Sequence, residues 1–279
     1  MRIGVRAAAR ASGLLCLLWA GTARAQGTTV LAPEASDAKA REVIEQSIQA
    51  LGGAAYLGVR DISSVSRIGQ FGHSGAVTGY EVLYDFKILP DKDRLEISKK
   101  RNIINVWNGD DAWTLDRGGV SDGPVGAVER NQEALHKSVN HLFRFRLRDP
   151  EVVLRYAGLD MVDLKQVDWV EASDAQRYTL RIAIDHATHL PVRAVCTWRD
   201  PKTREQTEEI EYFSDYHSIQ GVMTPLQDFR ERNGLQTYQL FTLEVKYNTG
   251  LSPDLFTRQS LEEKWAHTGK GKKGTEEKP

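Results

Sequence analysis

The sequence predicts an α+β fold in which helices cover one face of a large, curved antiparallel sheet. Two segments have helical periodicity, residues 36–51 and 124–148. Seven segments between residues 151 and 247 have strand character and are joined by short polar links. Strands at this spacing favour antiparallel hairpins over β–α–β units. The chain of 279 residues is long enough to bury the core of a single β-rich domain.

The amino terminus predicts export. Three arginines precede an apolar run centred on residues 14–19, and Ala23-Arg24-Ala25 has the small-x-small form that signal peptidase cleaves. The apolar run is shorter than the roughly 20 residues needed to cross a bilayer. We therefore expect a signal peptide over residues 1–25, cleavage after Ala25 and a periplasmic mature chain.

Charge and cysteine content narrow the possible partners of the mature chain. Removing residues 1–25 removes four of the 37 basic residues and none of the 38 acidic ones, which leaves 33 against 38 and a net charge of −5. This balance gives no reason to expect a nucleic-acid partner. Cys16 follows two leucines rather than small residues, so we expect no lipid anchor and at most transient membrane contact. Cys196 then has no partner for an internal disulfide.

Residues 26–35 are small and polar and are expected to form a flexible leader. The first helix should begin at Ser36 or Asp37 and stop at Gly52-Gly53. Its apolar stripe consists of Ala40, Val43, Ile44, Ile48 and Leu51. Period-two alternation then appears at Tyr80, Val82, Tyr84 and Phe86, and again at Leu95 and Ile97 after a Pro90-Asp91 turn.

NIINVWNGDDAWTLD, residues 102–116, predicts a hairpin that turns at residues 108–111, with Trp107 and Trp113 near the turn. The second helix, residues 124–148, carries an apolar stripe of Val128, Leu135, Val139, Leu142 and Phe143. Its arginine-rich end is interpreted as a solvated helix terminus. The charged tail over residues 261–279 has little to bury and is expected to be disordered.

IAIDHATHLPVRAV, residues 182–195, contains two histidines, His186 and His189, which raise the question of a metal site. A metal needs three or four directed ligands, and a third ligand would have to be Asp185 or the distant His217. Asp185 and Pro191 instead suit a turn between two strands. We expect no metal and no cofactor here.

Asp215 and His217 raise the alternative of a hydrolase. Two residues apart on a strand, their side chains share a face, whereas Ser214 and Ser218 should point to the other face with Tyr216, which is poor geometry for a catalytic relay. The sequence also lacks a G-x-S-x-G elbow, an H-E-x-x-H motif and a phosphate-binding glycine loop. We expect no catalytic residue and no enzymatic activity.

Four runs together resemble the outer-membrane lipoprotein-sorting (LolA/LolB-like) family. They are VWNGDDAWTLD (residues 106–116), D-x-x-T-x-L-P-V-R (185–193), DYHSIQGVMTPLQ (215–227) and YNTGLSPDLF (247–256). Their order, behind the helix that ends in Leu51-Gly52-Gly53, extends the resemblance over residues 36–260, which we treat as one domain. The family's carrier has a basic residue directly before a proline in an early strand, thought to hold the lid helices closed; here Leu89 precedes Pro90, with Lys87 and Arg94 nearby, so the chain resembles a divergent member.

The resemblance implies an incomplete antiparallel barrel of about eleven strands, with helices over its concave face and an apolar cavity between them. Burying one methylene group is worth about 0.8 kcal/mol, so such a cavity can hold acyl chains without catalysis. The resemblance therefore implies a periplasmic carrier of a lipid, of lipoprotein acyl chains or of a similar apolar ligand. Its relatives also include envelope sensors that bind a partner protein, which is the alternative function.

The candidate ligand-binding residues are apolar positions on the expected strands and on the expected lid helix. On the strands they are Tyr80, Val82, Tyr84, Trp107, Trp113, Leu180, Ile182, Phe241 and Val245. On the lid they are Val128, Leu135, Val139 and Leu142. The competing interpretation is that these residues form the ordinary packed core of the sheet.

Overall fold

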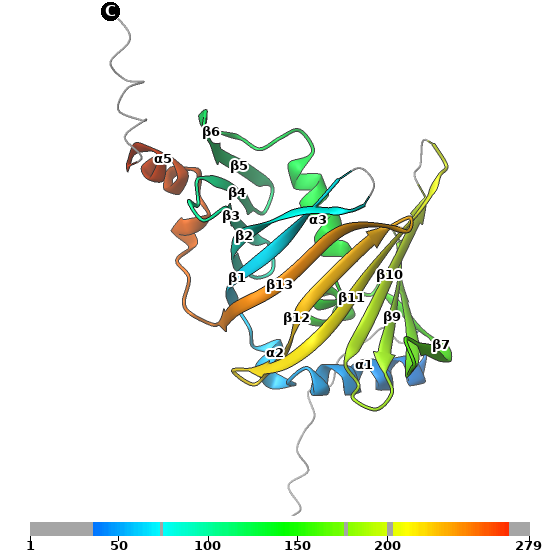
Figure 1. The fold of residues 1–279 in the computed structure, drawn as a ribbon. Helices are drawn as coiled ribbons and strands as arrows, with labels where there is room; N and C mark the ends of the chain where they lie inside the picture. Colours follow the sequence, from blue (N-terminus) through cyan, green and yellow to red (C-terminus); the bar gives the residue numbers. More distant parts are fainter. Residues whose placement is uncertain (1–35, 73–74, 176–177, 200–202, 268–279) are drawn as a thin grey trace, which may run out of the picture.

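Thirteen strands form one antiparallel sheet that curves around a concave face without closing into a barrel (Figure 1). The computed structural model describes residues 36–72, 75–175, 178–199 and 203–267, so the expected signal peptide and leader lie outside the described residues. The strand order is β6, β5, β4, β3, β2, β1, β13, β12, β11, β10, β9, β8, β7. The strands are β1 Asp61–Phe71, β2 Val77–Ile88, β3 Lys92–Ile97, β4 Ile103–Asn108, β5 Asp111–Asp116, β6 Gly119–Asp122, β7 Val153–Val162, β8 Lys165–Ser173, β9 Thr179–Asp185, β10 Pro191–Arg199, β11 Gln206–Ile219, β12 Val222–Arg232 and β13 Leu235–Tyr247.

The α+β class and the incomplete antiparallel barrel are confirmed, with thirteen strands instead of about eleven. The two unexpected strands are β1 and β6. β1 has weak apolar alternation because it carries Ser63, Ser64 and Ser66 in its centre. It nevertheless occupies the middle of the sheet, between β2 and β13.

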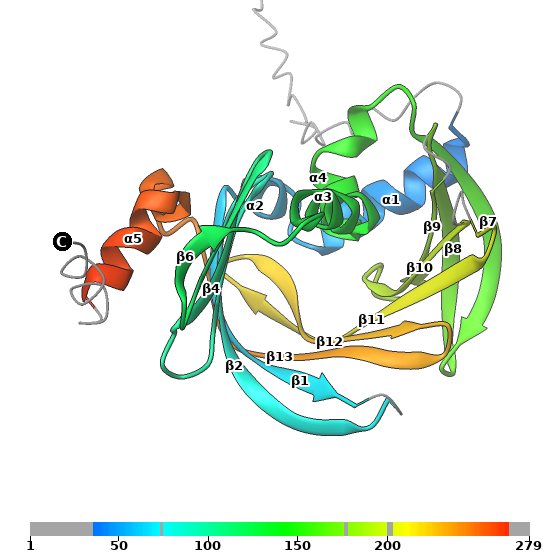
Figure 2. The same ribbon diagram turned by 90° about the horizontal axis from the view of Figure 1, so that it is seen from above.

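The strand order explains why helices cover the concave face. Strands β6 and β7 are consecutive in the chain but lie at opposite edges of the sheet. The segment between them must therefore cross the sheet, and it carries α3 (Ala127–Lys137), α4 (Val139–Arg144) and the short 3-10 helix η1 (Arg146–Arg148). Seen from above, α3 and α4 lie inside the curve of the sheet, beside α1 (Figure 2). We call residues 127–148, which include α3, α4 and η1, the lid segment.

The lid segment is broken, whereas the sequence predicted one helix over residues 124–148. Ser138 has an extended backbone (φ −77°, ψ 128°) and ends α3. Its hydroxyl then accepts a hydrogen bond from the His141 amide at 3.3 Å and caps the start of α4. A serine at this position can serve as the N-cap of a second helix, and that local gain competes with continuing the first one.

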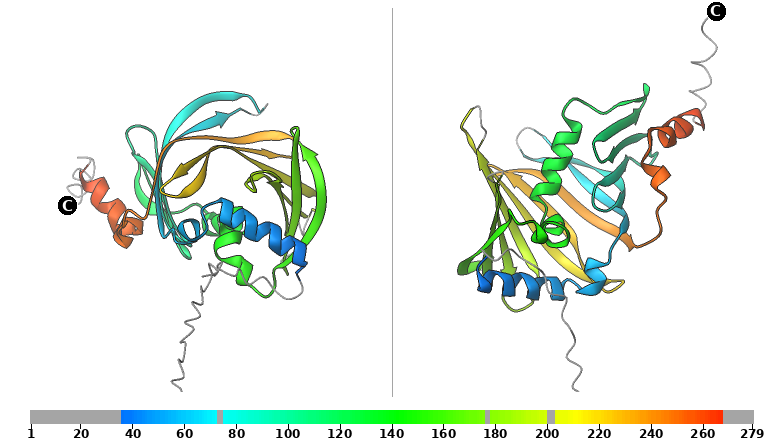
Figure 3. Two further views of the ribbon diagram at one scale, coloured as in Figure 1. Left: turned by 90° about the horizontal axis from the view of Figure 1, so that it is seen from below. Right: turned by 180° about the vertical axis from the view of Figure 1, so that it is seen from behind.

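The amino-terminal helix α1 (Ala38–Ala50) crosses the opening of the curved sheet and contacts β7 and β8 (Figure 3). The Asp37 carboxylate caps it, accepting from the Lys39 amide at 2.8 Å. The predicted stripe is confirmed, because Ala40, Val43, Ile44, Ile48 and Leu51 are all buried in the main core.

The predicted stop at the glycine pair is also confirmed. A short helix, α2 (Ala54–Leu57), follows it. Gly52 has φ +124°, and a Cβ there would lie 2.3 Å from the Gly221 carbonyl oxygen of the β11–β12 turn. Only glycine permits this approach of the two backbones.

The carboxy-terminal helix packs on the opposite, convex side of the sheet. The 3-10 helix η2 (Pro253–Phe256) and α5 (Arg258–His267) lie against β3 to β6, on the far side of these strands from α3 (Figure 2). Phe256 and Leu261 are fully buried there with Ile104, Val106 and Leu115. The expected disordered tail is therefore wrong for residues 261–267, because Leu261 anchors α5 to this second core. Residues 268–279 lie outside the described part of the chain.

Candidate functional site

A cavity of about 390 Å³ lies between the helices and the concave face of the sheet. Its volume falls within the range of roughly 300–1,000 Å³ that is usual for small-molecule sites. Apolar side chains from nearly every surrounding element line it: Leu51, Ile62, Leu89, Leu135, Val139, Phe145, Phe213, Val222, Met223, Leu240 and Val245. Tyrosines and charged residues complete the wall: Tyr56, Tyr216, Tyr247, Lys87, Asp93, His141, Arg144 and Arg230. We call this space the central cavity.

The α4 side of the central cavity is held by Arg144. Its guanidinium carbon lies 3.9 Å from the centroid of the Tyr56 ring, and its Nη1 donates to the Tyr56 carbonyl oxygen at 2.6 Å. The Tyr56 hydroxyl donates to the Asn140 side chain at 2.9 Å. Burial raises the pKa of Tyr56 to about 12, so this hydroxyl keeps its proton at neutral pH. These contacts connect α2 to α4 at one end of the cavity.

The β2–β3 side of the central cavity is charged. The Lys87 ammonium lies 3.0 Å from one Asp85 oxygen and 2.6 Å from one Asp93 oxygen. Lys87 and Asp93 line the central cavity, and Asp85 is on the same face of β2 as Lys87, so the cluster lies inside the curve of the sheet. Burial raises the pKa of Asp85 to about 7, helped by the Asp93 charge and opposed by that of Lys87. The interior of the half-barrel thus contains a carboxyl group that titrates near neutral pH.

A second polar space of about 400 Å³ adjoins the central cavity on the β10–β12 side. The two share Ala134 and Ser138 of the lid segment and Arg230 of β12. Arg230 is held by the Glu211 carboxylate at 2.7 Å. Over this space, Lys137 of α3 lies 3.3 Å from the Trp198 ring centroid. The lid segment therefore contacts both spaces.

Stability should depend on pH through Asp85. Its folded pKa of about 7 exceeds its unfolded value of 3.8, so the linked stability is fully present below pH 3.8 and is lost as the pH rises through about 7. The substitution Asp85→Asn removes this ionisation. On raising the pH from 4.5 to 8, the wild type should lose about 1–3 kcal/mol of unfolding free energy through this group. The variant should not show this loss, so the difference between variant and wild type should change in favour of the variant by that amount.

Urea unfolding at the two pH values measures this change. The exposed Glu244 on β13, paired with Lys246, supplies the control variant Glu244→Gln, which should show no such trend. An equal difference between Asp85→Asn and wild type at both pH values would contradict the prediction.

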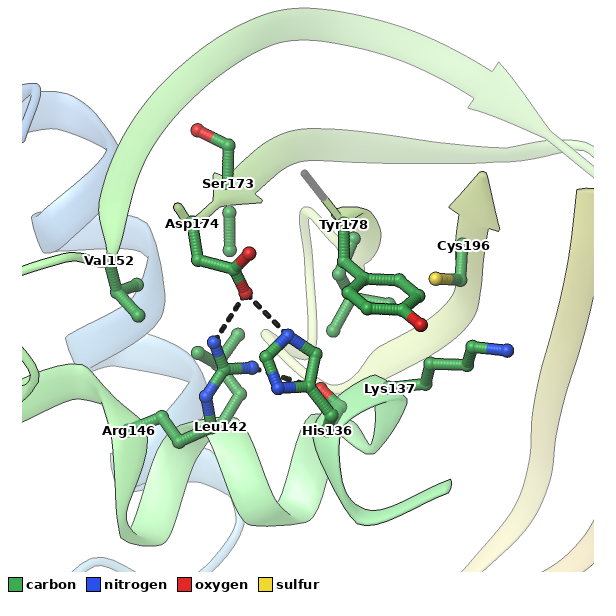
Figure 4. Close-up of a pocket in the computed structure, with 11 residues that line it drawn as sticks. His136, Lys137, Leu142, Arg146, Val152, Ser173, Asp174, Tyr178 and Cys196 are labelled. Atoms are coloured by element: carbon green, nitrogen blue, oxygen red, sulfur yellow. Dashed lines mark hydrogen bonds and ion pairs between the residues drawn. The ribbon is translucent and has the colours of Figure 1, made fainter. Parts of the chain in front are cut away.

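A cluster that we call the lid latch fastens the lid segment to the β8–β9 side (Figure 4). The Asp174 carboxylate lies 2.5 Å from His136 Nε2 of α3 and 2.6 Å from Arg146 Nη2 of η1. Arg146 Nη1 also donates to the His136 carbonyl oxygen at 2.9 Å. The Tyr178 ring packs against the His136 imidazole, with centroids 4.8 Å apart. The latch thus ties the end of α3 and the start of η1 to one carboxylate.

The lid latch is not arranged as a catalytic relay, although a histidine, an aspartate and Cys196 lie around one space (Figure 4). That space has a volume of about 10 Å³, room for about one water molecule. Burial raises the pKa of the Cys196 thiol to about 12, which keeps it protonated and unreactive. Burial and the Arg146 charge lower the pKa of His136. The arrangement is suited to holding the lid in place.

The structure places Val245, Leu135 and Val139 of the sequence-predicted residues on the wall of the central cavity. Trp107 points to the same side of the sheet and donates its indole N–H to the Ala127 carbonyl oxygen of α3 at 3.2 Å. Leu142 and Leu180 line the small space beside the lid latch. Ile182 is fully buried in the main core.

The remaining predicted strand residues point away from the central cavity. Tyr80 and Phe241 contact each other on the convex face, with ring centroids 6.2 Å apart. The positions on β2 that share this face are Val82, Tyr84 and Phe86, and Phe86 packs in the second core with Trp113. Their assignment to the cavity is corrected for a physical reason: alternation puts successive side chains on opposite faces but does not say which face encloses the ligand space. Val128 and Trp113 border a separate groove at the β5–β6 edge.

Sequence analysis missed the charged residues on the inner face of the sheet. Asp85 and Lys87 alternate with the apolar residues of β2, so they point to the face opposite Phe86. The sequence did contain a signal for them: on β2, charged residues occupy the positions between the apolar ones, which gives this central strand one charged face. Leu89, at the position of the carrier's basic residue, lines the central cavity. Arg94 is instead buried on the convex side, bonded to Glu96 and to the Leu255 carbonyl oxygen.

The histidines of residues 182–195 belong to a turn. The Asp185 carboxylate accepts from the Ala187 and Thr188 amides at 3.0 and 2.9 Å and closes the turn. His186 Nδ1 lies 2.7 Å from an Asp168 oxygen, and His189 has φ +58°. Within the described residues no group of three or more His, Cys, Asp or Glu side chains could hold a metal ion.

Asp215 and His217 interact at the surface. His217 Nε2 lies 2.9 Å from Asp215 Oδ1, and the two side chains are 57% and 46% exposed. Asp215 has φ +56°, and it and Leu226 opposite it are both passed over in the pairing of β11 with β12, without a shift of register. The alternation of β11 changes at this irregular position: Tyr216 lines the central cavity, as Phe213 does, instead of sharing a face with Tyr212, which lies under the Arg193 guanidinium.

The described part of the chain contains no helix that is both long and apolar enough to span a membrane. No protein-family model matches the sequence, and no curated protein matches it.

Solved structures do match the fold. A DUF1329 family protein from Desulfovibrio piger superposes with a TM-score of 0.58 at 16% identity, covering 80% of this chain and 98% of that one. A proposed outer membrane lipoprotein-sorting protein domain from Vibrio parahaemolyticus gives 0.54 at 12% identity, covering 80% and 98%. A LolA superfamily protein from Nitrosomonas europaea gives 0.51 at 13% identity, covering 80% and 99%. The resemblance is confirmed: the chain has the fold of the LolA-like, outer-membrane lipoprotein-sorting proteins, as a divergent example of it.

Proposed function

We propose that the mature chain is a periplasmic binding or carrier protein, without enzymatic activity, that holds a lipid, lipoprotein acyl chains or a similar apolar ligand. The observation that carries this proposal is the central cavity, because it places an apolar-lined volume of about 390 Å³ beneath a lid. A preformed apolar cavity can bind an alkyl chain by removing its surface from water. The fold shared with a LolA superfamily protein agrees with this role.

The arrangement of the potentially reactive groups supports a non-enzymatic role. His136 and Asp174 are engaged in the lid latch, and the Cys196 thiol is buried and protonated. His217 and Asp215 are exposed on the outer part of β11. None of these pairs faces the central cavity.

Native mass spectrometry with organic extraction tests the proposal on the mature protein, purified from a bacterial periplasm without detergent. We expect a co-purifying lipid or acylated peptide at a stoichiometry near one. An empty protein that also fails to bind a neutral fluorescent apolar probe would refute the carrier function. In that case the alternative, an envelope module that binds a partner protein, would take its place.

A further inference from the structure

Three carboxyl groups on the inner face of the sheet each leave one oxygen without a partner. Asp85 Oδ1, Asp93 Oδ1 and Asp228 Oδ1 are buried and accept no hydrogen bond from an amide, hydroxyl or cationic group of the described residues. Their polar neighbours include further carboxyl groups: Asp85 and Asp93 lie beside each other, and Asp228 lies beside Glu211. Buried polar atoms are nearly always satisfied, because an unmet bond costs the desolvation of the group. Three such atoms of one chemical type on one face call for a common explanation.

The three groups face the interior of the half-barrel. Asp85 is on the same side of β2 as Lys87, which lines the central cavity, and Asp93 pairs with Lys87 across the β2–β3 register. Asp228 lies on β12 between Phe213 of β11 and Leu240 of β13. Both of these register partners line the central cavity.

Tyr238 connects the two acidic positions. It is on β13, two residues from Leu240 and on the same face. Its pKa is raised by burial and then by the charges of Asp228 and Asp85, with Arg230 and Lys87 opposing. Asp228 on β12 and Asp85 on β2 are thus both close enough to the Tyr238 hydroxyl for their charges to raise its pKa.

The charge on this part of the wall is unbalanced. Four carboxyl groups, those of Asp85, Asp93, Asp228 and Glu211, face two cations, Lys87 and Arg230. Burial and the neighbouring Glu211 raise the pKa of Asp228 well above its ordinary value. Burial likewise raises the pKa of Asp85, so both groups favour their protonated form when no further positive charge lies beside them. A bound cation would let these carboxyl groups ionise and would donate hydrogen bonds to their oxygens.

From these contacts we propose that the ligand of the central cavity is an amphiphile with a cationic, hydrogen-bond-donating head, such as a primary amine, which binds to Asp85, Asp93 and Asp228. The alkyl chain occupies the apolar space beneath the lid segment. This inference rests on the proposed function and adds the chemical class of the head group. The cations on the wall are already engaged and so are less suited to an anionic head. Lys87 is paired with Asp85 and Asp93, Arg230 with Glu211, and the Arg144 guanidinium contacts the ring and the carbonyl oxygen of Tyr56.

Three single-chain ligands of equal length distinguish the possible head groups. Dodecylamine, dodecanol and laurate, each at a concentration where it is dissolved as single molecules, compete with a neutral fluorescent probe for the full mature protein at pH 7. We expect the amine to bind about tenfold more tightly than the alcohol, and laurate to bind more weakly than the alcohol. Equal affinities, or a preference for laurate, would overturn the amine assignment while leaving the carrier function intact. Failure of all three to bind would refute both.

A double variant locates the head group. Asp85→Asn with Asp228→Asn keeps the shape of both side chains and removes both ionisable groups. We expect the amine's advantage over the alcohol to shrink by about tenfold, with the affinity for dodecanol unchanged. Glu244→Gln removes one negative charge from an exposed residue of the same sheet and should leave the preference as in wild type. An unchanged preference in the double variant would overturn the assignment.

Discussion

Replacing Leu240 with tryptophan should strongly weaken the binding of apolar ligands while the protein stays folded. Leu240 is on the inner face of β13 and lines the central cavity. The indole ring would occupy volume that the ligand needs, so we expect the affinity for a fluorescent apolar probe to fall at least about tenfold. Space already exists at this position, so the overpacking cost of roughly 1–3 kcal/mol seen in filled cores should be smaller here.

Leu243→Trp is the matched control for this experiment. Leu243 is on the same strand but is 62% exposed, outside the central cavity. Fluorescence titration of both variants with one probe, alongside urea unfolding, separates filling of the cavity from loss of the fold. Normal binding by the Leu240 variant would mean that the ligand does not occupy the central cavity.

Removing the carboxylate of the lid latch should release the lid segment. In Asp174→Ala, the Arg146 guanidinium, only 15% exposed, loses its counter-ion, and His136 loses its bonding partner. Breaking a largely buried ion pair from one side costs on the order of 3 kcal/mol, because the remaining charge stays desolvated. We expect a loss of about 2–4 kcal/mol in the free energy of unfolding, with faster amide hydrogen exchange over α3 and α4 than over the sheet.

Asp163→Ala provides the comparison for the latch. The Asp163 side chain is 75% exposed and pairs with Arg193 at 2.9 Å, so its removal should cost about 1 kcal/mol or less. Equal losses in the two variants, or unchanged exchange over α3 in Asp174→Ala, would show that the latch does not hold the lid.

Elements that depend on neighbouring residues were predicted better from the sequence than those that depend on distant contacts. The stripe of α1 and the hairpin turn at residues 108–111 were predicted correctly, since both depend on residues close together in the chain. The break at Ser138 was missed because a serine capping a new helix and a serine inside a continuous helix give the same local pattern. The end of α5 was missed because Leu261 and Trp265 become buried only against strands far away in the sequence.

The wall of the central cavity shows why the ligand-binding residues on β2 could not be predicted from the sequence. The apolar face of β2 was assigned to the ligand, yet it lies on the convex side, where Phe86 and Ile88 pack under η2 and α5. The charged face, with Asp85 and Lys87, is the one that points to the central cavity. In a sheet covered on one side only, the apolar face marks the interior; here helices cover both sides, so that rule fails for β2.

The sequence by itself determined the types of eleven of the thirteen strands, the course of α1 and the α+β class, because periodicity and turn chemistry act between neighbours in the chain. The tertiary structure alone decided which face of each strand encloses the cavity and which carboxylate fastens the lid. Period-two alternation separates two faces but leaves them equivalent until other elements pack on them. Two long-range features make that choice. The pairing of β1 with β13 joins residues more than 100 positions apart at the centre of the sheet. The chain between β6 and β7 crosses from one edge of the sheet to the other and places the lid segment over one face.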